Sequence, residues 1–167
     1  TDLLRLQAEN RRLQDELDAQ ALKDRTTGLL NPRGLLVALE PQVSRSRRYG
    51  NPLSMAVLQV TGEHIGERQL VGLAQLLKDQ LRWADLVGYG GDGEYILALP
   101  ETRLDDALKL AGKLTDLMAA RFGDELLPTF GVVEWGRTDS AQSLLKRARA
   151  ALGRARAAEA PGAVAAG

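Results

Sequence analysis

The residues best suited to chemistry lie in one stretch, Arg82–Tyr95, where a run of Gly and Asp separates two apolar segments. The apolar flanks, residues 85–89 and 94–99, predict the strands of a β-hairpin with residues 90–93 at its tip. Gly and Asp tolerate the positive φ angles that tight hairpin turns require. A glycine-rich turn also lets a ligand phosphate come close to backbone N–H groups. The stretch therefore predicts a phosphate-binding hairpin.

The segments on either side of the hairpin predict an α+β domain that positions it. Apolar periodicity and Gly and Pro breakers predict helices at 31–49, 66–82, 104–121 and 140–157, and strands at 53–60 and 127–135. Asn31 is expected to cap the first of these helices, with Pro32 at its first position. This order of elements indicates an α+β sandwich around a largely antiparallel sheet.

A helix over residues 1–21 precedes that domain and has the apolar spacing of a coiled coil. Its expected dimer seam alternates in steps of three and four residues and consists of Leu3, Leu6, Asn10, Leu13 and Leu17. A buried Asn at such a position favours a parallel dimer in fixed register. The alternative is an ordinary amphipathic helix packed on its own domain. The predicted organisation is a signalling helix at 1–22, a domain at 23–157 and a disordered tail at 158–167.

Composition limits the classes of function. The chain has 167 residues, with 22 Lys and Arg balanced by 22 Asp and Glu, so we expect no DNA or RNA partner. It has no cysteine, which excludes disulfides and thiolate metal sites and fits a reducing compartment. No apolar run in the sequence reaches membrane-spanning length, and we expect no signal peptide at Thr1. We expect a cytoplasmic segment without membrane contact.

Several motifs, taken in order, resemble those of GGDEF domains, the bacterial diguanylate cyclases. Asp24–Asn31 is similar to the opening DxLTGLxN, Arg82–Asp85 matches RxxD, and residues 129–133 and 144–148 match the closing strand and helix. The resemblance implies the palm-like fold of nucleotidyl cyclases, with a five-stranded, mostly antiparallel sheet flanked by helices. In that family two domains, each carrying one GTP, face each other to make cyclic di-GMP.

The same resemblance indicates that the catalytic half of the site is damaged. Cyclisation needs carboxylates that hold Mg²⁺, and the family's metal-binding Asp positions fall on Gln59 and Thr61. Counted from Arg82 without a gap, the signature's acidic metal ligand becomes Gly93 and its second acid is Glu94. A register slipped by one residue leaves Asp92 able to hold a metal, and the sequence leaves this choice open.

The groups that hold the product in the family are retained. Its inhibitory site uses the Arg and Asp of RxxD, here Arg82 and Asp85, and a basic residue at the spacing of Lys113. A further Arg comes from the helix before the first strand, where Arg45 lies, and the ring of Trp83 could stack on a base. The competing interpretation is a surface ion pair of little energetic value.

The resemblance therefore predicts a catalytically degenerate GGDEF domain that binds cyclic di-GMP and acts as a receptor and regulatory signalling module. We expect it to have no metal or cofactor of its own. One alternative is a weakly active diguanylate cyclase that uses Mg²⁺, supported by Glu94 and Asp92. Another is a purely structural dimerisation module.

Overall fold

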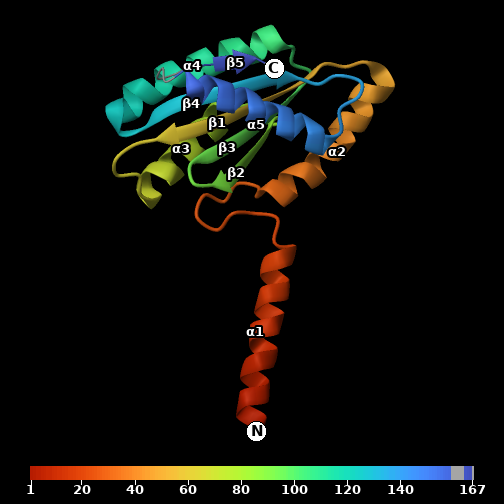
Figure 1. The fold of residues 1–167 in the computed structure, drawn as a ribbon, viewed down its shortest axis with the longest axis vertical. Coiled ribbons are helices and arrows are strands. Elements are labelled where there is room, and N and C mark those ends of the chain that lie inside the picture. The colour runs from red at the N-terminus through yellow and green to blue at the C-terminus, as the bar shows by residue number, and fades with distance from the viewer. Residues whose placement is uncertain (159–163, 167) are drawn as a thin grey trace.

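In the computed structural model, which describes residues 1–158 and 164–166, an N-terminal helix precedes a β-sheet that is flanked by helices (Figure 1). The helices are α1 (Asp2–Gln20), α2 (Pro32–Tyr49), α3 (Glu67–Gln80), α4 (Leu104–Phe122), the 3₁₀ helix η1 (Gly123–Glu125) and α5 (Ala141–Ala157). The strands are β1 (Leu53–Thr61), β2 (Leu86–Gly91), β3 (Glu94–Pro100), β4 (Leu127–Glu134) and β5 (Val164–Ala166). Each predicted helix and strand is present to within a few residues, and the Asn31 cap is confirmed because its side chain accepts from the Gly34 N–H.

The strands lie in the order β2-β3-β1-β4-β5. The first four pair antiparallel, as predicted. In the described part of the chain this antiparallel sheet has four strands rather than the expected five, and the three-residue β5 adds to it in parallel beside β4. The predicted disorder of the tail is therefore wrong for residues 164–166, because backbone pairing with an open strand edge orders even small residues. The rest of the tail, residues 159–163 and 167, lies outside the described residues.

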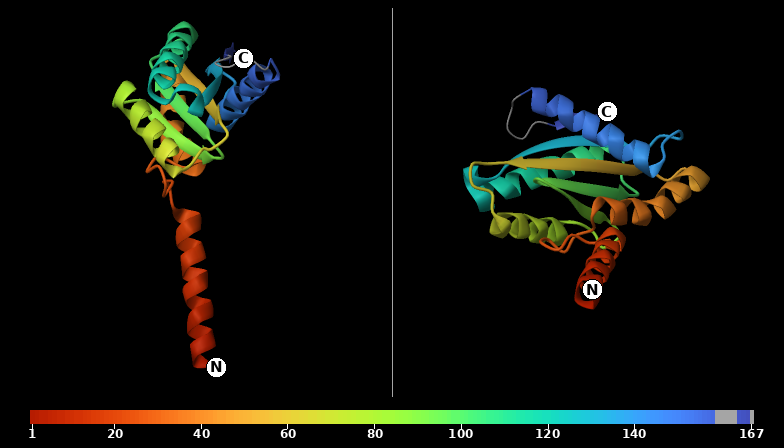
Figure 2. Two further views of the ribbon diagram at one scale, coloured as in Figure 1. Left: turned by 90° about the vertical axis from the view of Figure 1, so that its left-hand side faces the viewer. Right: turned by 60° about the horizontal axis from the view of Figure 1, so that its bottom comes forward.

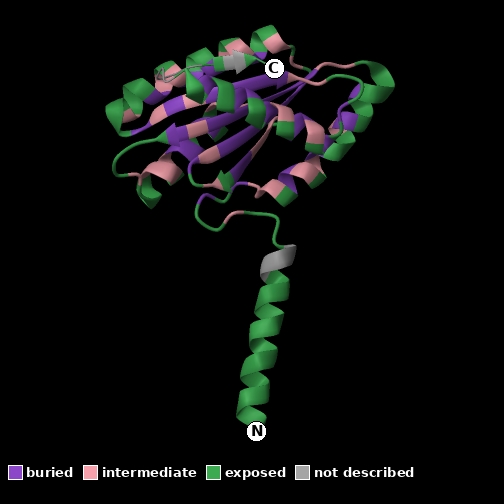
Figure 3. Cartoon of the chain, viewed as in Figure 1, coloured by how far each residue is buried: buried purple, intermediate pink, exposed green. Residues whose placement is uncertain are grey.

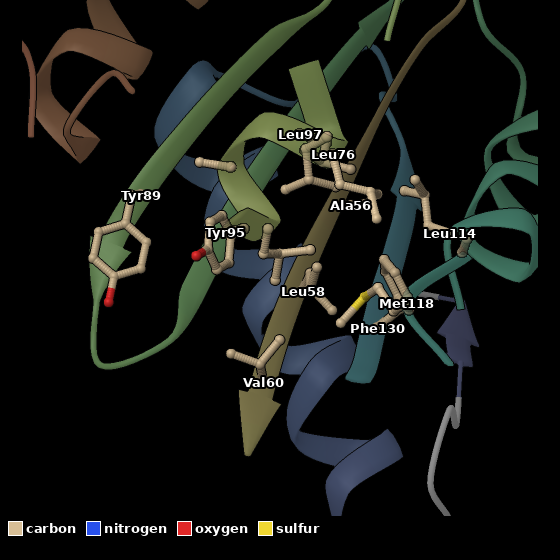
Figure 4. Close-up of a cluster of buried hydrophobic side chains, with 14 of the residues drawn as sticks. Ala56, Leu58, Val60, Leu76, Tyr89, Tyr95, Leu97, Leu114, Met118 and Phe130 are labelled. Atoms are coloured by element: carbon tan, nitrogen blue, oxygen red, sulfur yellow. The ribbon is translucent and has the colours of Figure 1, made fainter. Parts of the chain in front are cut away.

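Helices cover both faces of the sheet (Figure 2). Because side chains alternate along a strand, Leu58 and Leu97 pack with α3 and α4, whereas Val57 and Ile96 pack with α2 and α5. Figure 4 shows the first of these cores, in which Leu114 and Met118 of α4 meet Phe130 of β4. The loops at the two ends of this sheet carry the residues that are candidates for binding a ligand or a metal.

Helix α1 projects away from the domain and is exposed along its described side chains (Figures 1 and 3). The exposed fractions of Leu3, Leu6 and Leu17 are 67%, 57% and 62%. The prediction that α1 is a helix is confirmed, and the alternative in which it packs on its own domain is wrong. No helix within the described residues is long and apolar enough to cross a membrane.

The connection between α1 and α2 is fixed to the edge of the sheet. The Leu30 carbonyl accepts from the Tyr89 N–H at 2.8 Å, and Leu30 bridges to Gly88 of β2. The Asn31 side chain donates to the Ala21 carbonyl at 2.8 Å, while Asp24 accepts from the Thr27 N–H and hydroxyl at 2.8 Å each. The Asp24–Asn31 motif is therefore a folded turn that attaches α1 to β2.

Candidate functional site

The β2–β3 hairpin, predicted as the phosphate-binding feature, closes on the two residues Asp92 and Gly93. Both have positive φ, 51° and 81°, as type I′ hairpin turns require. The pairing register shifts between Tyr89 and Gly91, so Gly90 forms a bulge. The side chain of Asp92 is exposed, whereas Gly93 is buried. A Cβ at Gly93 would lie 2.8 Å from the Val60 carbonyl, so this turn has no room there for an acidic side chain.

Gln59 lies at the end of β1, opposite Glu94 in the β1–β3 ladder. Its amide nitrogen donates to the Asp92 carbonyl at 2.6 Å and more weakly to the Val60 carbonyl at 3.2 Å. An amide that donates to a carbonyl presents N–H groups, not lone pairs, toward the hairpin tip. Within residues 1–158 and 164–166, no group of three or more His, Asp or Glu side chains is placed to hold a metal ion. The amide of Gln59 and the glycine at position 93 do not supply the carboxylates that the Mg²⁺ site implied by the resemblance requires.

Glu94 is the acidic residue at the start of β3, and its carboxylate contacts helix α5. Both of its oxygens accept from Arg149, at 3.0 Å from Nε and 2.7 Å from Nη2. The side chain of Glu94 is 16% exposed and that of Arg149 is 44% exposed. The hairpin is thereby attached to α5 by a two-point ion pair.

Tyr95 follows Glu94 and anchors the hairpin in the core (Figure 4). Its hydroxyl donates to the Leu70 carbonyl of α3 at 2.7 Å, and its ring meets that of Tyr89 edge-on at 5.0 Å between centroids. Burial, with smaller contributions from Tyr89 and Asp24, raises the pKa of the Tyr95 phenol well above its ordinary value. The Tyr89 hydroxyl in turn accepts from the Gly93 N–H at 3.0 Å, which ties the turn to this aromatic pair.

Arg82 and Asp85 form a tight turn between α3 and β2. Asp85 Oδ2 accepts from the Arg82 N–H at 2.8 Å, and Oδ1 lies 3.2 Å from Arg82 Nη2. The same Nη2 donates to the Pro100 carbonyl at 2.7 Å and to the Thr102 hydroxyl at 2.8 Å. The guanidinium is therefore fixed against the end of β3, while the Arg82 side chain stays 57% exposed and that of Asp85 is 4% exposed.

The structure brings together only part of the predicted ligand set. Trp83 lies in the same turn as Arg82 and is 98% exposed. Lys113 is an exposed residue on α4, which covers one face of the sheet. Arg45 lies on α2, which covers the other face, in a shallow hollow with Arg48 and Tyr49. One copy of the domain therefore places Arg45 across the sheet from Lys113.

Two residues at these sites were missed by the sequence analysis. The sequence alone assigns no role to Arg149 or to Thr102. Arg149 lies 55 residues from Glu94, so no local spacing indicates their contact. Thr102, by contrast, lies three residues after the strand predicted at 94–99, and its position near the strand end was a usable signal.

Residues 21–160 match the family model described as the diguanylate cyclase GGDEF domain. The diguanylate cyclase DgcM of Escherichia coli K12 is 32% identical over 161 residues, covering 89% of this chain and 39% of DgcM. The diguanylate cyclase DgcP of Pseudomonas aeruginosa is 31% identical over 152 residues, 82% of this chain and 23% of DgcP. The chain thus spans about two fifths of DgcM and less of DgcP.

Solved structures show the same architecture. The diguanylate cyclase SiaD of P. aeruginosa, solved with its activator SiaC, superposes with a TM-score of 0.75 at 31% identity, over 98% of this chain and 68% of that chain. The GGDEF domain of DgcB from Caulobacter crescentus, solved with c-di-GMP, has a TM-score of 0.78 over 88% of this chain and 93% of that chain. At 18% identity this second likeness shows the fold alone. From the family match and the relatives above 30% identity, the chain belongs to the GGDEF domain family of diguanylate cyclases.

Proposed function

We propose that this GGDEF domain has lost cyclase activity and binds cyclic di-GMP at the Arg82–Asp85 turn as a regulatory receptor. The observation that carries the proposal is the contrast between two sites of one domain. At the hairpin tip, an amide and a glycine replace groups that should hold metal. At the RxxD turn, the guanidinium is fixed by three acceptors while the Arg82 side chain as a whole is still more than half exposed.

The loss of catalysis rests on Gln59 and Gly93. Phosphoryl transfer in this family depends on carboxylates that hold Mg²⁺ against the phosphates. Gln59 directs N–H groups at the Asp92 carbonyl, and Gly93 has no room for a side chain. Loss of one electrostatic contact to a transition state costs roughly 3 kcal/mol, so the combined changes abolish turnover. Chromatography after incubation with GTP and Mg²⁺ or Mn²⁺ tests this, and formation of cyclic di-GMP would contradict it.

Ligand binding rests on the shape of the RxxD turn. Nη2 of Arg82 is occupied within the domain, which leaves Nη1 to donate to a guanine edge or a phosphate. The exposed ring of Trp83 in the same turn offers a face for a purine to stack on. Lys113 extends the site along α4, and Arg45 joins it from a second copy, because it lies across the sheet within one copy. Binding of cyclic di-GMP to the wild type and its loss in Arg82→Ala would support this assignment.

The regulatory part of the proposal rests on α1. Its seam residues Leu3, Leu6, Asn10, Leu13 and Leu17 are all exposed on the single chain. Burying such a stripe against a parallel copy is the usual way that a heptad helix is stabilised. A dimer through α1 would place two domains beside each other. Sedimentation of the chain with and without residues 1–20 tests the dimer.

A further inference from the structure

We infer that Arg149 is a built-in counterion that takes the place of a divalent cation at the β2–β3 hairpin and keeps such cations out. The inference rests on the proposed loss of the metal site and assigns the group that replaces it. Arg149 comes from α5, outside the hairpin and β1.

The Arg149 guanidinium neutralises the Glu94 carboxylate through a two-point ion pair. The guanidinium donates through Nε to Glu94 Oε2 at 3.0 Å and through Nη2 to Oε1 at 2.7 Å. Such two-point Arg–carboxylate pairs fix orientation as well as charge. Mg²⁺ and Mn²⁺ bind through carboxylate oxygens, and both oxygens of Glu94 are already engaged. A cation that approaches Glu94 therefore meets the positive charge of Arg149, which already donates to both carboxylate oxygens.

The neighbouring residues complete this arrangement. A Cβ at Gly90 would overlap Glu94 Oε1, so the glycine provides the space in which the carboxylate lies. Gln59 faces Glu94 in the strand ladder and donates to the Asp92 carbonyl at 2.6 Å. A carboxylate at position 59 would instead face both Glu94 and that carbonyl oxygen. The neutral Gln59 and the cationic Arg149 together make the hairpin stable without a metal.

A four-way comparison tests the inference directly. Wild type, Gln59→Asp, Arg149→Met and the Gln59→Asp/Arg149→Met double variant are titrated with Mn²⁺, and free Mn²⁺ is followed by electron paramagnetic resonance. We expect the double variant to bind Mn²⁺ at least about tenfold more tightly than Gln59→Asp, a difference of about 1.4 kcal/mol. Equal Mn²⁺ affinities of Gln59→Asp and the Gln59→Asp/Arg149→Met double variant would overturn the inference. The absence of Mn²⁺ binding by both variants would also overturn it.

A matched control separates the ion pair from general charge. Lys146 is an exposed cation on the same helix, three residues before Arg149. Gln59→Asp/Lys146→Met should bind Mn²⁺ no better than Gln59→Asp; an equal gain from either cation would show that only net charge matters. Circular dichroism establishes that each variant is folded.

A second measurement does not depend on metal binding. In urea unfolding of Arg149→Met, Glu94→Gln and their combination, the ion pair predicts a double variant less destabilised than the sum of the single variants. Strict additivity would overturn the inference. Neither experiment uses cyclic di-GMP, so failure here is distinguishable from failure of the proposed receptor function, which a ligand titration decides.

Discussion

The Asp85 carboxylate lies 3.2 Å from Nη2 of Arg82, yet Asp85 is almost completely buried and Arg82 is more than half exposed. The acid therefore acts within the domain, as the acceptor that orients the guanidinium and closes the turn through the Arg82 N–H. A preoriented arginine loses less conformational freedom when it binds a ligand.

Asp85→Ala is expected to weaken cyclic di-GMP binding even though the side chain is buried. It removes the acceptor of three Arg82 hydrogen bonds, so it should also lower the free energy of unfolding by about 2 kcal/mol. Calorimetry and urea unfolding measure the two effects. Asp116→Ala, which removes an exposed acid from α4, serves as the control and should change neither.

Trp83→Ala is expected to reduce ligand affinity without changing stability. The side chain is 98% exposed, so its loss should change the free energy of unfolding by less than about 0.5 kcal/mol. Loss of a base-stacking surface costs roughly 1–3 kcal/mol of binding. Trp83→Phe should retain most of the affinity, and equal affinities for Trp83→Ala and wild type would rule out stacking.

Gly93→Ala should destabilise the domain more than Gly91→Ala does. Both residues have positive φ, 81° and 90°, so both alanines carry backbone strain of about 1–3 kcal/mol. Only at Gly93 does the new Cβ also meet a backbone atom, the Val60 carbonyl at 2.8 Å, whereas at Gly91 nothing lies within 4 Å. Thermal unfolding of the pair isolates the steric contribution, and equal losses would contradict the tight turn described above.

Tyr95→Phe should cost about 1 kcal/mol at pH 8, because it leaves the Leu70 carbonyl without its donor. Burial raises the pKa of the Tyr95 phenol in the folded state. Above the unfolded pKa of about 10, the unfolded chain releases a proton that the folded chain keeps, so wild-type stability falls as pH rises. The Tyr95→Phe variant does not lose stability in this way. The difference in the free energy of unfolding between wild type and Tyr95→Phe should therefore shrink between pH 8 and pH 11. Urea unfolding at the two pH values shows whether it does.

Leu6→Asp should dissociate the dimer proposed for α1, whereas Leu4→Asp should leave it intact. The two leucines are similarly exposed on the single chain, at 57% and 65%, but only Leu6 lies on the heptad seam. Sedimentation equilibrium of both variants beside the wild type makes the comparison. An equal response of both variants would show that α1 does not associate through this seam.

The elements and the RxxD turn could be predicted because their determinants are local. Asn31 and Pro32 mark a helix start, the apolar run that includes Val57 and Leu58 marks a buried strand, and the Arg82–Asp85 contact spans three residues. Each of these signals lies within a few consecutive residues of the sequence.

The side-chain contacts of the hairpin site could not be predicted in the same way. The contact of Gln59 with Asp92 spans 33 residues and that of Glu94 with Arg149 spans 55, so both depend on the packing of the sheet against α5. The separation of Arg45 from Lys113 depends on which sheet face each helix covers. Strand β5 was missed because small residues such as Ala165 and Ala166 have little strand preference of their own.

Isothermal titration calorimetry with cyclic di-GMP tests the central claim most directly, with wild type, Arg82→Ala and Arg137→Ala measured at the same protein concentration. Arg137 is an exposed arginine in the β4–α5 loop and serves as the control for charge. Hydrogen bonds to a charged group contribute about 1.5–3 kcal/mol, so Arg82→Ala should bind roughly tenfold more weakly or worse. The account predicts saturable binding by wild type and Arg137→Ala and a large loss in Arg82→Ala. No binding by wild type at high micromolar ligand, or equal binding by Arg82→Ala, would contradict it.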